Sequence, residues 1–122
     1  MNRASELQST INQLRRGELA PADIRQCLNH ASPVIRANAI EACGLLASQD
    51  ASFISDLKGA ALDRSNDINL MGAITLAHVA IGCLLKIENT EAKNAAAIAI
   101  RSLPNAQQED LLLYLKSENI PL

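Results

Sequence analysis

The stretch Ser32–Leu46 constrains the fold of this chain more than any other part of its sequence. Ser32 is a typical N-cap residue, because its hydroxyl can accept a hydrogen bond from a free N–H of the first helical turn. Pro33 suits the first helical position, where it loses no hydrogen bond and already has a helical φ. Apolar residues then recur at helical spacing on one side, at Ile35, Ala39, Ile40, Cys43 and Leu46. We predict a helix over 33–47 that neighbouring helices must cover.

The order of residues in this stretch resembles the first helix of a HEAT-like repeat. A polar cap is followed by the Val/Ile-Arg pattern that ends at Arg36, then by Ala37, and later by the Gly-Leu pair 44–45. Repeats of this bacterial type also occur in phycobilisome-lyase-like proteins. The resemblance implies an α-α superhelix, a short right-handed stack of antiparallel helical pairs. It also implies a structural role for Arg36, whose counterpart in such repeats packs its stem inside the stack.

The composition favours an all-α protein. Hydrophobic residues make up 48% of the 122 positions, but Phe53 and Tyr114 are the only aromatic ones. Helices favour Ala and Leu, which abound here, whereas strands favour aromatic and β-branched residues. The length suits one core rather than two. We therefore predict a single helical domain over residues 1–122.

Helix start and stop signals divide the chain into seven predicted helices. Asp67 is the expected N-cap of the fifth and longest of them. Connections between the segments are short, so consecutive helices should pack antiparallel, as three pairs and a closing helix. The predicted ranges are 4–16 with 21–29, 33–47 with 52–63, 67–87 with 91–103, and then 106–117.

An internal similarity supports a stack of repeats. Residues 37–40 align with residues 71–74, and the caps Ser32 and Asp67 fall at nearly the same offset, about 34 to 35 residues, which is typical of helical-pair repeats. The match is weak residue by residue, so a compact bundle of six or seven helices remains the alternative.

An almost charge-free run of 18 residues extends from Ile68 to Leu85 and reaches the lower limit for spanning a bilayer. It contains Asn69, Thr75 and His78, and it lacks interfacial Trp or Tyr. We expect a buried helix here and no membrane association. The polar N-terminus and the odd number of cysteines favour a reducing cytoplasm.

No motif in the sequence predicts catalysis, a cofactor or a metal site. The three cysteines, Cys27, Cys43 and Cys83, sit in apolar helical patterns and share no ligand spacing with His30 or His78. His78 is expected to be a core histidine with a hydrogen-bonded ring. The basic residues form no strong patch, so we expect no nucleic-acid partner. We predict that the chain is not an enzyme.

A protein partner remains the predicted binding target. In a stack of helical pairs the second helices line the concave side, so their outward polar residues are the candidate contacts. These are Arg25, Asn29, Asp56, Asp63, Lys93 and Arg101. The predicted function is a non-catalytic protein-protein interaction module or adaptor. The alternative is a bacterial immunity protein that inhibits a toxin, because ten of the thirteen acidic residues follow residue 36.

The last predicted helix carries four leucines in the five residues 111–115. So continuous an apolar run covers more than one side of a helix. Either the helix docks deeply on the stack, or its uncovered leucines bind a second copy. We expect docking and a monomer, because Gln107, Gln108, Asp110 and Lys116 offer polar positions for the outer face.

Overall fold

Helices form most of the part of the chain that the computed structural model describes, residues 3–122. Residues 1 and 2 of the predicted domain lie outside this description. The helices are α1 (Arg3–Arg16), α2 (Pro21–Cys27), α3 (Pro33–Leu46), α4 (Ser52–Leu62), α5 (Leu76–Lys86), α6 (Thr90–Ser102) and α7 (Asn105–Ser117). The remaining elements are a 3-10 turn, η1 (Arg64–Asn66), and two short strands, β1 (Asn69–Met71) and β2 (Ile74–Thr75). The prediction of an all-α fold with about seven helices is confirmed.

Local signals place six of the seven helices within about two residues of their predicted bounds. The Ser32 hydroxyl accepts a hydrogen bond from the N–H of Ile35 at 3.4 Å, so α3 begins as its cap predicts. The Asn89 side chain accepts one from the N–H of Ala92 at 2.8 Å and begins α6 in the same way. Both caps satisfy backbone donors that a helix start otherwise leaves free.

The predicted helix over 67–87 is wrong in its first third. Residues 69–75 form an antiparallel two-stranded hairpin, in which Gly72 adopts a φ of 58° that favours glycine. Asp67 closes the 3-10 turn η1 and forms an ion pair with Arg64 at 3.3 Å, so it does not begin a helix. Thr75 is the N-cap of α5 instead.

The corrected start of α5 also overturns the predicted repeat offset. Residues 71–74 belong to the hairpin, so they are not the structural counterparts of residues 37–40 in α3. The N-cap of α5 is Thr75, which lies farther from Ser32 than the predicted 34 to 35 residues. Among the described residues, no helix is both long and apolar enough to cross a membrane.

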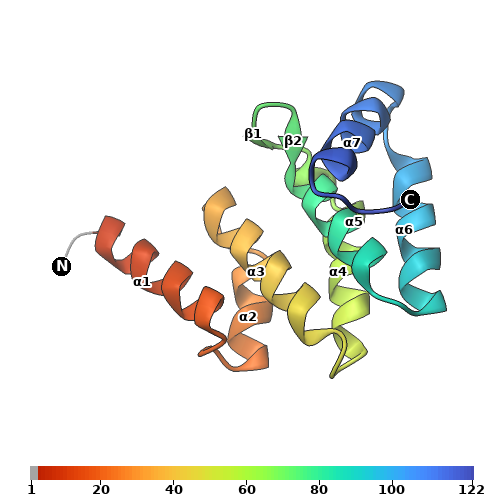
Figure 1. Ribbon diagram of the computed structural model, residues 1–122. Coiled ribbons are helices and arrows are strands. Elements are labelled where there is room, and N and C mark those ends of the chain that lie inside the picture. The colour runs from red at the N-terminus through yellow and green to blue at the C-terminus, as the bar shows by residue number, and fades with distance from the viewer. Residues whose placement is uncertain (1–2) are drawn as a thin grey trace.

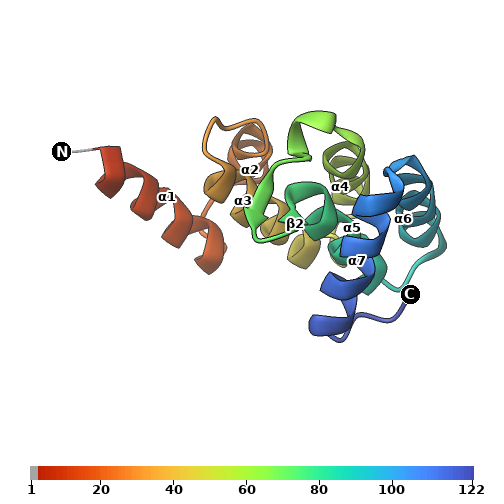
Figure 2. The ribbon, with the colours of Figure 1, turned by 90° about the horizontal axis from the view of Figure 1, so that it is seen from above.

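The helices lie in two layers. One layer contains α1, α3, α5 and α7, and the other contains α2, α4 and α6, as the two views show (Figures 1 and 2). In the second layer α2 packs against α3, α4 packs against α3 and α5, and α6 packs against α5. The helices α3, α5 and α7 follow one another side by side. The core lies between the layers and is built on Ile35, Ile40, Phe53, Leu57, Ile81 and Leu84.

Two glycines let helices of the first layer approach closely. A Cβ on Gly44 of α3 would lie 2.9 Å from the Sγ of Cys83 on α5. A Cβ on Gly82 of α5 would lie 3.1 Å from the ring of Tyr114 on α7. Both distances are shorter than normal van der Waals contact. The helices can therefore lie this close together only because glycine has no side chain at these two positions.

Candidate functional site

Two of the six predicted contact residues bind each other. The guanidinium of Arg25 on α2 lies 2.8 Å from a carboxylate oxygen of Asp56 on α4, and it also donates a 2.7 Å hydrogen bond to the Ser52 hydroxyl. Its Cζ atom stacks 4.3 Å from the centre of the Phe53 ring. The hydrogen bond with Asp56 is the main reason that the pKa of Arg25 is raised. This cluster connects α2 to α4, so these two side chains serve the packing of the second layer.

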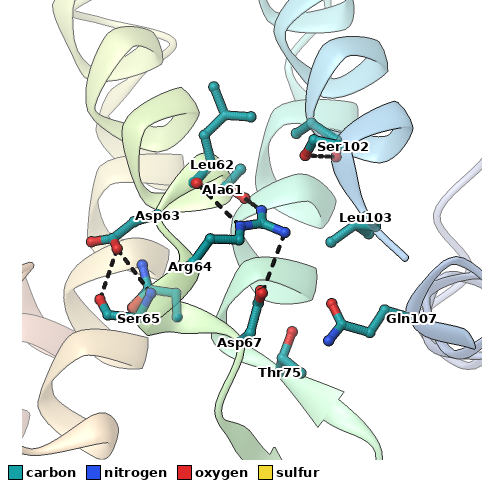
Figure 3. Close-up of polar contacts among 12 residues, drawn as sticks. Ala61, Leu62, Asp63, Arg64, Ser65, Asp67, Thr75, Ser102, Leu103 and Gln107 are labelled. Carbon is teal, nitrogen blue, oxygen red and sulfur yellow. Dashed lines mark hydrogen bonds and ion pairs between the residues drawn. The ribbon is translucent and has the colours of Figure 1, made fainter. Parts of the chain in front are cut away.

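Two further predicted residues lie apart from each other. Asn29 is exposed in the turn that follows α2. Asp63 caps η1, where its carboxylate accepts hydrogen bonds from the Ser65 N–H at 2.9 Å and the Ser65 hydroxyl at 2.8 Å (Figure 3). These bonds lower the pKa of Asp63. Neither residue lines the groove that Lys93 and Arg101 share.

The last two predicted residues, Lys93 and Arg101, line one groove. Both are exposed on α6, eight positions apart, which is about two helical turns or ~12 Å. The groove has a volume of about 410 Å3 and lies along the side of α6 next to the C-terminal tail. Its other lining residues are Leu85, Ala97, Ile100, Pro121 and Leu122. We name these seven residues the end groove.

The sequence analysis did not predict the apolar lining of the end groove. Ala97 and Ile100 share the helical face of Lys93 and Arg101, and this spacing was a usable signal. Leu85 on α5 and the residues 121–122 reach the groove only through tertiary packing. The result is an apolar surface between two positive charges, which suits an amphipathic segment with acidic flanks.

A second, larger groove of about 690 Å3 lies between the C-terminal ends of α3 and α5. Leu45 is 76% exposed on its edge. The charged groups along it have both signs, Glu41 and Glu88 against Lys86. Because these charges alternate, this groove has less electrostatic preference for one kind of partner than the end groove has.

His78 lies in a polar cluster at the N-terminal end of α5, and its side chain is fully buried. The ring Nδ1 of His78 accepts a hydrogen bond from the backbone N–H of Thr75 at 3.1 Å, and the backbone N–H of His78 donates one to the Thr75 hydroxyl at 3.2 Å. The Nε2 lies 2.9 Å from the carbonyl oxygen of Gln107 on α7, to which it donates as the neutral tautomer. Burial lowers the pKa of His78. Both ring nitrogens are therefore engaged, as predicted for a core histidine.

The neighbouring loop completes the cluster. Arg64 donates to the carbonyl oxygens of Ala61 at 3.2 Å and Leu62 at 3.3 Å, and it reaches Asp67, with Thr75 and Gln107 alongside (Figure 3). These contacts hold the η1 turn against the end of α4. Each of them satisfies a backbone or side-chain group of the fold.

The cysteines are buried or half-buried free thiols. Burial raises the pKa of Cys43 and of Cys83 to about 12, which keeps both as thiols at neutral pH. Across residues 3–122, no cluster of three or more His, Cys, Asp or Glu side chains could hold a metal ion.

No protein-family model, curated protein or solved structure matches the chain.

Proposed function

We propose that this chain is a protein-protein interaction module without catalytic activity, and that it binds its partner in the end groove. The observation that carries the proposal is the position of Lys93 and Arg101 on either side of the apolar residues Ala97 and Ile100. The resemblance of Ser32–Leu46 to HEAT-like repeats supports the same class of function.

The end groove fits a partner helix. The second layer ends at α6, whose main packing partners are α4 and α5 on its inner side. The groove follows the side of α6 that faces the end of α5 and the C-terminal residues 121–122. A helix with apolar residues at positions i, i+3 and i+4 matches the groove floor, and acidic residues about two turns apart reach the two cations.

The three free thiols support a reducing compartment, and we propose the cytoplasm. The alternative of a bacterial toxin inhibitor with an acidic surface has less support. Asp56 and Asp67 pair with arginines, and Asp50 and Asp63 accept hydrogen bonds from neighbouring serines. Four of the ten acidic residues after residue 36 are thus engaged within the fold.

A phage-displayed library of random peptides, selected on the intact protein, tests the proposal. We expect enrichment of peptides with an apolar helical face and Asp or Glu about seven positions apart. The double variant Lys93→Glu/Arg101→Glu should weaken their binding by about tenfold or more, because both flanking charges become repulsive. The control variant Arg16→Glu changes an exposed cation on α1, far from the groove, and should leave binding unchanged.

Two results would count against the end groove. One is a selection that enriches no peptide, and the other is a set of peptides that binds the double variant as tightly as the parent protein. If Leu45→Asp weakens peptide binding and the double variant does not, the interface lies on the larger groove between α3 and α5.

A further inference from the structure

The closing helix α7 docks and also leaves two leucines uncovered. Leu111, Tyr114 and Leu115 are buried, and Tyr114 contacts α5 at Gly82. Leu112 is 52% exposed and Leu113 is 68% exposed. The polar residues expected to fill the outer face therefore do not cover its middle. A solvent-facing pair of leucines on a helix at the edge of the fold is a typical interaction surface.

Charged residues flank this pair symmetrically. Glu109 lies one turn before Leu112, Lys116 lies one turn after Leu113, and all four residues project from the same side of α7. Glu109 and Lys116 are seven positions apart, about 10.5 Å along the helix, which is too far for them to pair with each other. Within the described part of the chain, neither side chain forms an ion pair or a side-chain hydrogen bond. We name these four residues the α7 face.

We propose that the α7 face binds the α7 face of a second copy of this chain, with the two helices antiparallel. A twofold axis that passes between positions 112 and 113 brings Leu112 opposite Leu113 of the partner copy. The same axis brings each Glu109 opposite the partner's Lys116, so two ion pairs close around four leucines. A parallel arrangement would instead oppose like charges. The pattern is self-complementary, which is the property that a twofold-symmetric interface requires.

The area of the α7 face predicts a weak dimer. Two leucines and two charged residues from each copy cover less surface than a standard stable interface. Association should therefore depend on concentration in the micromolar to millimolar range. This surface differs from the end groove, so the dimer and the proposed partner binding can be tested separately.

Sedimentation equilibrium on the full chain tests the dimer. We expect the average mass to rise from 13.1 kDa toward twice that value as the concentration is raised about a hundredfold. Glu109→Lys and Lys116→Glu should each weaken association by about tenfold, because each variant makes its own α7 face uniformly charged. Arg16→Glu, a charge reversal of the same kind at an exposed position on α1, is the matched control and should have no effect.

Mixing the two variants provides the decisive measurement. An equimolar mixture of Glu109→Lys and Lys116→Glu should associate at least as well as the parent protein, since each positive face meets a negative one. Recovery in the mixture also shows that both variants fold. A mass of 13.1 kDa at every concentration would overturn the proposal. So would a dimer that persists in both variants, or a mixture that stays monomeric.

Discussion

At the scale of single residues, three helical glycines occupy different environments and show what glycine does in this fold. Gly44 and Gly82 stand where two helices of the first layer come closest, and a side chain there would enter the neighbouring helix. A Cβ on Gly59 of α4 would have no neighbour within 4 Å. The same residue type is thus required for packing in two places and only lowers helix propensity in the third.

This difference predicts opposite effects of one substitution. Gly59→Ala should stabilise the protein by roughly 0.5–1 kcal/mol, because alanine has the higher helix propensity and meets no neighbour. Gly44→Ala gains the same propensity but forces its Cβ against Cys83, and overpacking of this kind costs ~1–3 kcal/mol. Urea unfolding at 25 °C should show a net loss for Gly44→Ala and a gain for Gly59→Ala. Equal changes would mean that α3 and α5 are not in close contact.

A second residue-scale prediction concerns His78. Burial is the largest influence on its pKa and lowers it from 6.5, while the Gln107 carbonyl, Asp110 and Asp67 act in the opposite direction. The unfolded chain therefore binds a proton near pH 6.5 that the folded chain binds only at lower pH. Stability contributed by neutral His78 is present above pH 6.5 and is lost as the pH falls below it.

The ring resonances of His78 followed by NMR should titrate with a midpoint below 6.5. Protonation would also place a donor at Nδ1 against the N–H of Thr75, which opposes the charged form further. A midpoint above 6.5 would show that the charged form is favoured, and the capping arrangement described above would then be wrong.

At the scale of elements, the start of α5 shows how a tertiary contact chooses between two local signals. Asp67 and Thr75 are both capable N-cap residues. Thr75 is the N-cap that the fold uses, because Thr75 and His78 form the two reciprocal hydrogen bonds of a capping box. The ring of His78 also hydrogen-bonds to the Gln107 carbonyl of α7. Asp67 is engaged by Arg64, and residues between the two form the hairpin.

Matched variants distinguish the two starts. Thr75→Val keeps the shape of the side chain but removes the acceptor of the His78 N–H, and we expect a loss of about 1–2 kcal/mol in the free energy of unfolding. Asp67→Ala removes only a partly exposed ion pair and should cost no more than about 1 kcal/mol. Chemical denaturation of both variants checks this order. A larger loss of stability for Asp67→Ala than for Thr75→Val would indicate that the helix begins at residue 67.

At the scale of the whole molecule, the two-layer arrangement leaves the first helix with few neighbours. α1 packs mainly against α3, through Ile11 and Leu14 and a 3.1 Å hydrogen bond from Arg15 to Asn38. In contrast, α5 lies among α3, α4, α6 and α7, and almost all of its residues are buried. A helix packed on one side can open without disturbing the rest.

Hydrogen exchange should therefore differ along the chain. We expect the amides of α1 to exchange at least about tenfold faster than those of α5 under native conditions, since local opening of α1 exposes little of the core. Mass spectrometry of peptic fragments measures both regions in one experiment. Uniform protection across α1 and α5 would indicate that the layers unfold only as a unit.

The sequence by itself determined the helical class and the course of most helices. Caps such as Ser32 and Asn89 act on the first turn of their own helix, and apolar periodicity is a property of one segment. Both can therefore be predicted without knowing which segments pack together. Sequence reasoning also placed Lys93 and Arg101 on the outward side of one helix, and both are exposed.

Only the tertiary structure decided which candidates are used for packing and which remain on the surface. Arg25 and Asp56 lie 31 positions apart, and their pairing depends on how α2 packs against α4. The end groove needs Leu85 and the C-terminal residues beside α6, and the start of α5 needs a bond to a carbonyl 29 positions away. These outcomes depend on contacts between distant segments, whose energies no local pattern in the chain records.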